Sequence, residues 1–230
     1  YTSVPNPDLG PERSESFEGG VRWANDLVKA EIVGFHARYK NFIEQIETTG
    51  QAFPTPASPW VYQWVNRGRV KISGGEARLE VRPGNGFVAN AALSYANGDA
   101  INPAGVHTPL QTIDPVKVVT GVGYDDPARR FGGRVIATFA ASQDVSQTLG
   151  LGCSTAAGGG CFRGRDRFVL DLTAYARIAD RVTLRAGLFN LTDEKYWWWS
   201  DIRGLANSSA TRDAFSQPGR NATVSATFRF

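Results

Sequence analysis

The chain of 230 residues contains no methionine. Because a translated chain starts with methionine and this one starts at Tyr1, we expect a processed product or, in preference, a fragment without its amino-terminal part. No apolar run approaches the ~18 residues of a membrane-spanning helix, so any membrane crossing must use strands. The formal net charge of +3 is too small, and the arginines too scattered, for a nucleic-acid-binding protein.

Histidine is almost as scarce, with only His36 and His107. Neither belongs to a metal-ligand spacing such as HExxH, and no nucleophile motif such as GxSxG is present. We therefore predict no enzyme, no resident metal and no cofactor. We expect His36 to be a hydrogen-bonded strand residue. His107 lies in a long connection, where a neutral imidazole can ligate haem iron, although a solvated loop histidine is the commoner case.

Two cysteines, Cys153 and Cys161, are separated by seven residues rich in glycine and alanine. Metal sites prefer CxxC-like spacing, whereas an oxidising compartment favours a disulfide. The sequence therefore predicts a Cys153–Cys161 disulfide that closes a short loop.

The last ten residues, Asn221–Phe230, alternate strictly between apolar and polar side chains. Side chains alternate across a strand, so one face is wholly apolar and ends in Phe228 and Phe230. This is typical of a transmembrane barrel strand, whose apolar face meets lipid and whose polar face meets the lumen. An edge strand of a soluble sandwich is the alternative.

Nine strands are predicted in all: Glu15–Trp23, Val28–Phe42, Arg69–Arg82, Gly86–Ala96, Pro115–Tyr124, Phe131–Ala141, Arg167–Arg177, Arg181–Leu191 and Arg220–Phe230. Four connections are short and rich in turn residues. The other four are long: 43–68, 97–114, 142–166 and 192–219. Short turns on one side and long loops on the other are typical of an outer-membrane barrel. We predict an all-β, transmembrane antiparallel barrel.

The facing of the strands follows from their charges. In Arg69–Arg82 the charged residues Glu76, Arg78 and Glu80 recur at every second position, which suits a hydrated lumen. The pattern in Val28–Phe42 is mixed and leaves its facing open. Nine is an odd number, and bacterial single-chain barrels usually have an even number of strands. We therefore expect part of a barrel.

Three consecutive tryptophans, Trp197, Trp198 and Trp199, follow the penultimate strand. We favour the aromatic girdle at the membrane–water boundary, and a smaller role is stacking against a flat ligand such as a porphyrin. Because side chains alternate along a strand, at least one tryptophan should point toward the lumen or a loop.

Three segments carry a family resemblance. Asn6–Gly20 resembles the "NPxLxPE…E.G" segment of TonB-dependent outer-membrane receptors, and Leu188–Tyr196 resembles their "NLtDkkY" penultimate strand. Gln217-Pro-Gly-Arg220 and the final Arg-Phe resemble their closing strand. The residues that carry the first motif are Asn6, Pro7, Asp8, Leu9, Pro11 and Glu12. More narrowly, Leu110–Pro115, the Gly123–Gly133 region and Tyr196–Leu205 resemble the haemoglobin and haem receptor branch.

The resemblance implies an outer-membrane receptor made as a signal-peptide-bearing precursor, with a 22-stranded barrel around a plug. Residues 1–230 would supply the last nine strands, without the plug. Its partners would be outer-membrane lipid, TonB acting through the plug, haemoglobin or another haem protein, and the insertion machinery that reads Phe228 and Phe230. Haem would be the cargo.

The loops of such a receptor would line part of the ligand's approach. The residues that we expect there are His107, Trp197, Trp198, Trp199, Arg203 and Arg212, because aromatic rings can stack on a porphyrin and arginines can pair with its carboxylates. Uptake of a siderophore or another nutrient is the alternative within the family. A soluble or surface-attached β-rich adhesin is the alternative outside it.

Overall fold

In the computed structural model, residues 2–48, 55–59, 61–66, 68–102, 104–149, 151–155, 159–179 and 181–229 are described. Nine long strands and one short one form an antiparallel sheet in the order β13-β12-β11-β10-β9-β7-β6-β3-β2, with β8 beside β7. The strands are β2 (Arg13–Ala24), β3 (Val28–Lys40), β6 (Arg69–Gly84), β7 (Phe87–Ile101), β8 (His107–Pro109), β9 (Lys117–Asp125), β10 (Phe131–Ala140), β11 (Arg167–Ala179), β12 (Val182–Phe189) and β13 (Asn221–Phe228). All nine predicted strands are confirmed.

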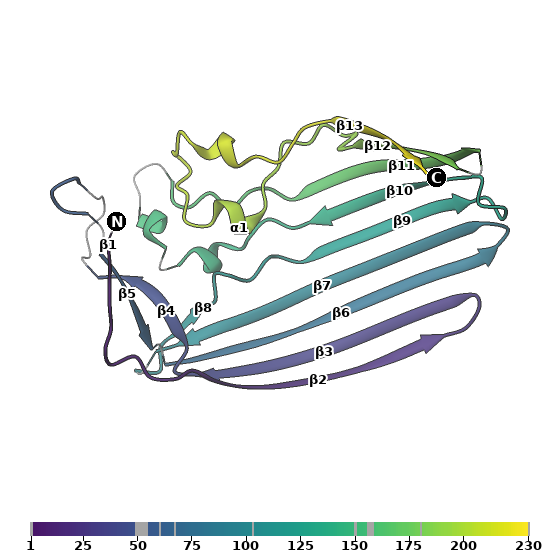
Figure 1. The fold of residues 1–230 in the computed structure, drawn as a ribbon. Helices are drawn as coiled ribbons and strands as arrows, with labels where there is room; N and C mark the ends of the chain where they lie inside the picture. Colours follow the sequence, from purple (N-terminus) through teal and green to yellow (C-terminus); the bar gives the residue numbers. More distant parts are fainter. Residues whose placement is uncertain are drawn as a thin grey trace.

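The connections alternate as predicted, with tight turns at one end of the sheet and long loops at the other (Figure 1). The turn between β6 and β7 shows why the sequence makes it tight. Gly84, Asn85 and Gly86 all have positive φ, and glycine and asparagine adopt this conformation at the lowest steric cost.

The register assigns each side chain to one of two faces, because directly paired residues lie on the same face. Val21 pairs with Ile32, which pairs in turn with Ala77. Even-numbered residues of β3 therefore lie on the apolar face. The register thus settles the facing of this strand, which the mixed sequence pattern of Val28–Phe42 left open.

This apolar face runs unbroken across the sheet and is exposed. Its large side chains are Phe17, Val21, Trp23, Ile32, Leu79, Phe87, Leu93, Val122, Val135, Phe168, Leu188, Val224 and Phe228. An exposed apolar surface of this extent is what a lipid bilayer requires of a barrel wall. Phe228 of the predicted assembly signal lies on it, and Phe230 lies outside the described residues.

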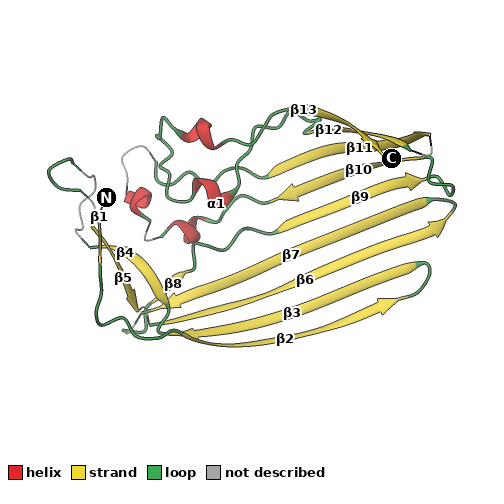
Figure 2. Cartoon of the chain, viewed as in Figure 1, coloured by secondary structure: helices red, strands yellow, loops and turns green. Residues whose placement is uncertain are grey.

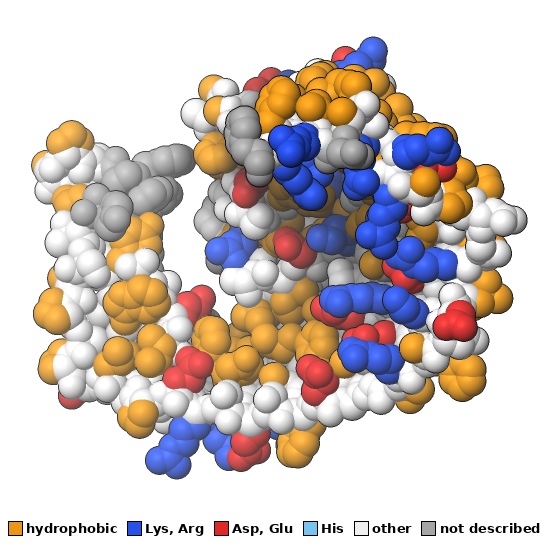
Figure 3. Space-filling view, turned by 45° about the vertical axis from the view of Figure 1, so that its right-hand side comes forward, with side chains coloured by type: hydrophobic (Ala, Val, Ile, Leu, Met, Phe, Trp, Pro, Cys, Tyr) orange, Lys and Arg blue, Asp and Glu red, His pale blue; other side chains and the backbone are white. Residues whose placement is uncertain are grey.

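The opposite face carries charged residues of both signs level with the apolar band, and Figure 3 shows basic and acidic side chains around a hollow. Arg22 forms an ion pair with Glu31 at 2.8 Å. Glu80 forms ion pairs with Lys29 at 3.4 Å and with Arg82 at 2.9 Å. Alternating charges that pair across and along strands suit a hydrated lumen, as the sequence predicted.

The sheet curves but does not close. Among the described residues, the outer edges of β2 and β13 pair with no other strand. Each edge therefore presents a row of unpaired backbone groups, which a bilayer does not tolerate.

The loop end carries structure that the sequence analysis did not predict (Figure 2). A second sheet has the order β1-β5-β4, where β4 (Ile43–Glu47) and β5 (Val61–Asn66) are antiparallel and β1 (Thr2–Val4) is parallel to β5. Four one-turn helices follow: η1 (Val145–Thr148), η2 (Gly152–Thr155), α1 (Trp199–Ile202) and η3 (Arg212–Phe215). In the described part of the chain, every helix is too short to cross a membrane.

Candidate ligand-binding site at the outer loops

Two long loops meet in a small hydrophobic cluster, which we call the loop core. It consists of Phe162, Trp197, Trp199 and Ile202, with Leu151 and Leu205 packed against it. Trp199 and Ile202 are almost completely buried, and the Phe162 and Trp197 rings meet edge to face at 5.0 Å. Loops 142–166 and 192–219 therefore pack as one unit.

Hydrogen bonds attach a third loop to this unit. The indole N–H of Trp199 donates to the Gln111 carbonyl at 2.6 Å, and the Gln143 amide donates to the Ile113 carbonyl at 2.8 Å. Within loop 192–219, the Trp197 indole donates to the Arg212 carbonyl at 2.9 Å. Buried indoles need such partners, and here they fix loop 97–114 against the other two.

The aromatic-girdle interpretation of the three tryptophans is wrong. Trp197 and Trp199 are 7% and 2% exposed, inside the loop core and away from the apolar face. Trp198 is partly exposed and lies under two cations, the Arg167 guanidinium at 4.5 Å and the Lys117 ammonium at 5.7 Å from its ring centre. The expectation that at least one tryptophan points toward the lumen or a loop is confirmed.

The disulfide between Cys153 and Cys161 is present in the structure. Both cysteines are buried, and Cys161 also forms a β-bridge with Ala206. The disulfide therefore joins the short helix η2 to the segment that leads into Phe162 of the loop core.

A cavity of about 720 Å³ lies between the β4–β5 hairpin and the loop unit. Its lining combines apolar, aromatic and polar side chains from four loops: Phe42, Ile46, Tyr62, Thr108, Leu110, Gln111, Leu151 and Arg203. This volume falls in the ~300–1,000 Å³ range of small-molecule sites. Helix α1 positions Arg203, because Trp199 and Ile202 anchor that helix in the loop core.

The structure does not bring the six predicted ligand residues together. Arg203 lines the cavity, whereas the Arg212 guanidinium stacks over Phe162 at 4.9 Å and helps to build the loop core. His107 is exposed in β8, with its Nδ1 3.9 Å from Asp99, and does not line the cavity. Their roles toward a ligand remain predictions.

His36 has the structural role that we expected. Its ring Nδ1 lies 2.7 Å from the Ser73 hydroxyl, and its Nε2 accepts from Arg38 at 2.9 Å. The described residues contain no cluster of three or more histidine, cysteine or carboxylate side chains that could hold a metal ion.

Ionisation in the loop unit follows its contacts. The Lys195 side chain bonds to Asp213 at 2.8 Å and lowers the pKa of that carboxyl, and Arg212 adds to the effect. Burial raises the pKa of the Tyr196 hydroxyl. At neutral pH the loop unit therefore carries an ionised Asp213 carboxylate and a neutral Tyr196 phenol.

The Asn6–Glu12 segment attaches the start of the chain to the β4–β5 hairpin. The Asn6 amide donates to the Trp64 carbonyl at 2.8 Å, and the Glu12 carboxylate accepts from the Ile43 N–H at 2.9 Å. Asn66 donates to the Gly10 carbonyl at 2.9 Å. The contacts give the motif a structural role: it holds the hairpin whose Ile46 and Tyr62 line the cavity, which we call the outer cavity.

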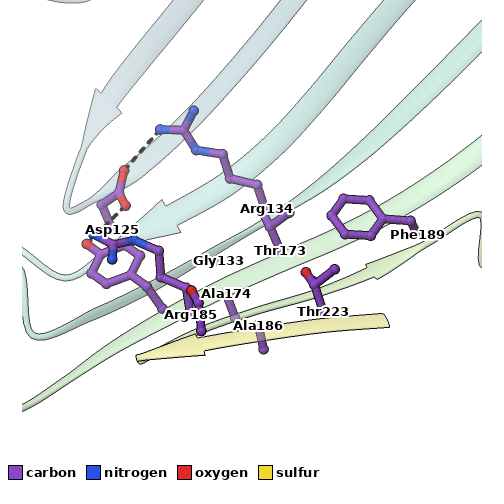
Figure 4. A pocket seen from close by; sticks show the side chains of 12 residues that line it. Asp125, Gly133, Arg134, Thr173, Ala174, Arg185, Ala186, Phe189 and Thr223 are labelled. Carbon is purple, nitrogen blue, oxygen red and sulfur yellow. Dashed lines mark hydrogen bonds and ion pairs between the residues drawn. The ribbon is translucent and has the colours of Figure 1, made fainter. Parts of the chain in front are cut away.

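A second hollow lies on the lumen face near the turns, with a volume of about 350 Å³ (Figure 4). At one end of it, Arg134 approaches the Asp125 carboxylate at 3.3 Å and the Tyr175 hydroxyl donates to the same carboxylate at 3.2 Å (Figure 4). Arg185 extends from β12 into the same hollow. These groups make a hydrated polar wall, and no predicted site residue belongs to it.

Comparison with known proteins gives the same answer as the fold. Residues 1–191 match the family model "TonB dependent receptor-like, beta-barrel". The chain is 27% identical over 255 residues to the hemoglobin-haptoglobin utilization protein B of Neisseria meningitidis serogroup C, covering 97% of this chain and 31% of that protein. It is also 27% identical over 260 residues to the probable hemoglobin and hemoglobin-haptoglobin-binding protein 4 of Haemophilus influenzae, covering 100% and 25%.

Among solved structures, the copper transporter OprC superimposes with a TM-score of 0.75 and 20% identity, covering 100% of this chain and 34% of that one. Such low identity supports the fold alone. The chain thus spans a quarter to a third of the length of the proteins that it matches.

The family match, the two-faced sheet and the segregation of turns and loops agree, and they remove the adhesin alternative. The family is one of receptors rather than enzymes, and its members reside in the bacterial outer membrane. The chain belongs to the TonB-dependent receptor-like β-barrel family, and its nine long strands are outer-membrane barrel wall.

Proposed function

We propose that the full-length receptor takes up an iron-bearing ligand, haem or haem from a haem protein, with energy supplied by TonB through a plug. The observation that carries this proposal is the relatedness along the whole chain to proteins named for haemoglobin and haemoglobin–haptoglobin. OprC is a copper transporter with the same fold, so the fold alone does not choose the cargo.

The outer cavity supports the haem assignment chemically. Haem is flat and apolar with two carboxylates on one edge. The cavity offers the Phe42 ring, the Leu110 and Leu151 side chains, and the exposed Arg203 guanidinium. Arginine pairs with a carboxylate through two parallel hydrogen bonds, and apolar walls favour the ring system.

The proposal also includes the strands that would complete the barrel and the plug inside it. The open edges of β2 and β13 pair with strands outside residues 1–230, and the full barrel surrounds the plug on which TonB acts. The lumen charges such as Glu80 and Arg82 then face that plug across water.

The test uses the full-length receptor in an iron-starved host that grows on haemin or haemoglobin as its sole iron source. Arg203→Glu should weaken haemin binding by the purified receptor about tenfold or more, because a charge-assisted hydrogen bond contributes ~1.5–3 kcal/mol. Arg203→Lys should retain part of the affinity, since lysine keeps the charge without the bidentate geometry.

Arg181→Glu is the matched control, because it reverses an exposed arginine at the turn end of the same wall. It should bind haemin as the wild type does. Growth on a ferric siderophore but not on haemin would remove the haem assignment and leave the barrel in place. Normal haemin binding by Arg203→Glu would contradict the assignment of the cavity as the haem site and leave the haem assignment itself in place.

A further inference from the structure

A basic patch occupies the outer face of three adjacent strands at their loop end. Arg13 of β2 pairs with Lys40 of β3, and Lys40 pairs with Arg69 of β6. One step toward the turns on the same face, Arg38 pairs with Lys71. We call Arg13, Arg38, Lys40, Arg69 and Lys71 the outer patch, and all five side chains are exposed.

The outer patch lies directly beyond the apolar band of the same face. A barrel strand needs ~9–11 residues to cross the hydrocarbon core. In β3 the outer face runs from Val28 through Ile32 and Gly34 to His36, and a crossing of eleven residues counted from Val28 ends at Arg38. The patch therefore stands at the level of the lipid headgroups, on the side of the long loops.

The patch cations differ from the lumen charges in their pairing. On the lumen face, Arg22, Lys29 and Arg82 each have a carboxylate within ion-pair distance. Among the described residues, none of the five patch cations forms such a pair.

Few carboxylates are available on this side of the wall. Glu15 lies opposite Arg38 in register, and Asp99 lies opposite Lys71 and beside His107. Arg38 donates its Nε–H to His36, which is neutral when it accepts this bond. Five cations against two carboxylates leave an excess of positive charge that points outward.

The patch is also confined to one sector of the wall. Among the described residues, the loop ends of β9, β10 and β11 carry no outer-face cation: Val118, Phe139 and Phe168 stand there, in the register row that Leu93 continues into the apolar band. A general surface charge would continue around the wall, whereas this one stops at β6. Such confinement fits discrete anionic groups held at one place.

We propose that the outer patch binds the phosphate groups of anionic lipids in the outer leaflet of the membrane. Lipids already surround this face, and their acyl chains would cover the apolar band while their phosphates reach the cations. Arginine forms bidentate hydrogen bonds to phosphate and lysine adds a point charge. Cations beside a membrane attract anionic lipids over about one Debye length.

The test measures lipid binding by the full-length receptor in detergent, using native mass spectrometry. The probes are lipid A with two phosphates and the same lipid after dephosphorylation. The triple variant K40Q/R69Q/K71Q should bind the phosphorylated lipid at least tenfold more weakly than the wild type. The dephosphorylated lipid should bind weakly to both, and added salt should weaken the wild-type binding.

The control triple variant R129Q/R177Q/R181Q removes the same charge from exposed arginines at the turn end and should bind as the wild type does. The variant K40R/K71R keeps the charge and should retain binding. If K40Q/R69Q/K71Q fails to insert, the double variant K40E/K71E takes its place. Loss of the phosphorylated lipid from K40E/K71E supports the proposal, and retention of that lipid overturns it. Equal binding of the two lipids, or unchanged binding by the neutral triple variant, overturns the proposal.

Discussion

The side-chain amide of Asn190 donates to the Pro218 carbonyl 3.1 Å away and so joins the end of β12 to the segment before β13. The same amide donates to the Glu194 carbonyl, and its oxygen accepts from the Glu194 N–H, both at 2.9 Å. Asn190 is 3% exposed and has a φ of 52°, which asparagine tolerates better than most residues. The Asn190-Leu-Thr-Asp193 segment is therefore a corner, at which the chain leaves β12 and Asn190 fixes its new direction.

Asn190→Ala should destabilise the receptor, because it leaves two carbonyls and an N–H without their partner. Each buried unpaired group costs about 1–3 kcal/mol. Heat modifiability on gels and thermal unfolding in detergent would measure the loss. Asn221→Ala is the control, since Asn221 is exposed and, among the residues that the structure describes, its amide donates to the nearby Gly219 carbonyl alone. Equal stability of the two variants would contradict the corner.

Reduction of the Cys153–Cys161 disulfide should loosen the loop core without preventing barrel insertion. Both cysteines lie in loop 142–166, outside the strands of the wall. Alkylation followed by intact-mass measurement should show two thiols only after reductant. Limited proteolysis should then cut loop 142–166 faster. Free thiols in receptor isolated without reductant would contradict the pairing.

Phe228→Asp, or deletion of Phe230, should lower the amount of receptor inserted in the outer membrane. Phe228 lies on the apolar face, where a charge costs up to a few kilocalories per mole at mid-depth and less near the boundary. Thr227→Asp places the same charge on the lumen face and should insert more efficiently. The fraction of heat-modifiable receptor in membranes measures both. Equal insertion of the two aspartate variants would refute the assignment of faces.

The turn before β10 should make stability depend on acid pH. The Arg130 side chain bonds to Asp126 at 2.8 Å and lowers the pKa of that carboxyl below its ordinary value of ~3.9. A lowered native pKa stabilises the folded state above the unfolded pKa, and the stabilisation disappears as pH falls through the native pKa.

Asp126→Asn should therefore be less stable than the wild type at pH 7, and the difference should shrink at pH 3. Urea unfolding in detergent at the two pH values measures it. Asp26→Asn, at another turn, is the control. A difference that persists unchanged at pH 3 would show that the carboxylate's charge is not responsible.

The long strands could be predicted from the sequence because their signal is local. Alternation in Asn221–Phe228 and the Gly84-Asn85-Gly86 turn are each written in a few adjacent residues. The facing of β3 required a neighbour, since only its register with Val21 and Ala77 separates lipid from lumen.

The loops could not be predicted in the same way. Burial of Trp197 and Trp199 depends on Phe162, which comes from a different loop, and no local pattern contains that contact. The same holds for Arg203, which lines the cavity because Trp199 and Ile202 anchor α1 in the loop core. It holds also for Arg212, whose guanidinium stacks on the Phe162 ring of another loop.

The shared loop core also has an evolutionary consequence. Surface loops of a receptor usually diverge independently, because each is exposed to its own selection. Here Phe162, Trp197, Trp199 and Ile202 must fit one another across two loops, while Gln111 ties a third to them. Substitutions in this core should therefore arise as matched sets, whereas exposed loop residues outside it should vary one at a time.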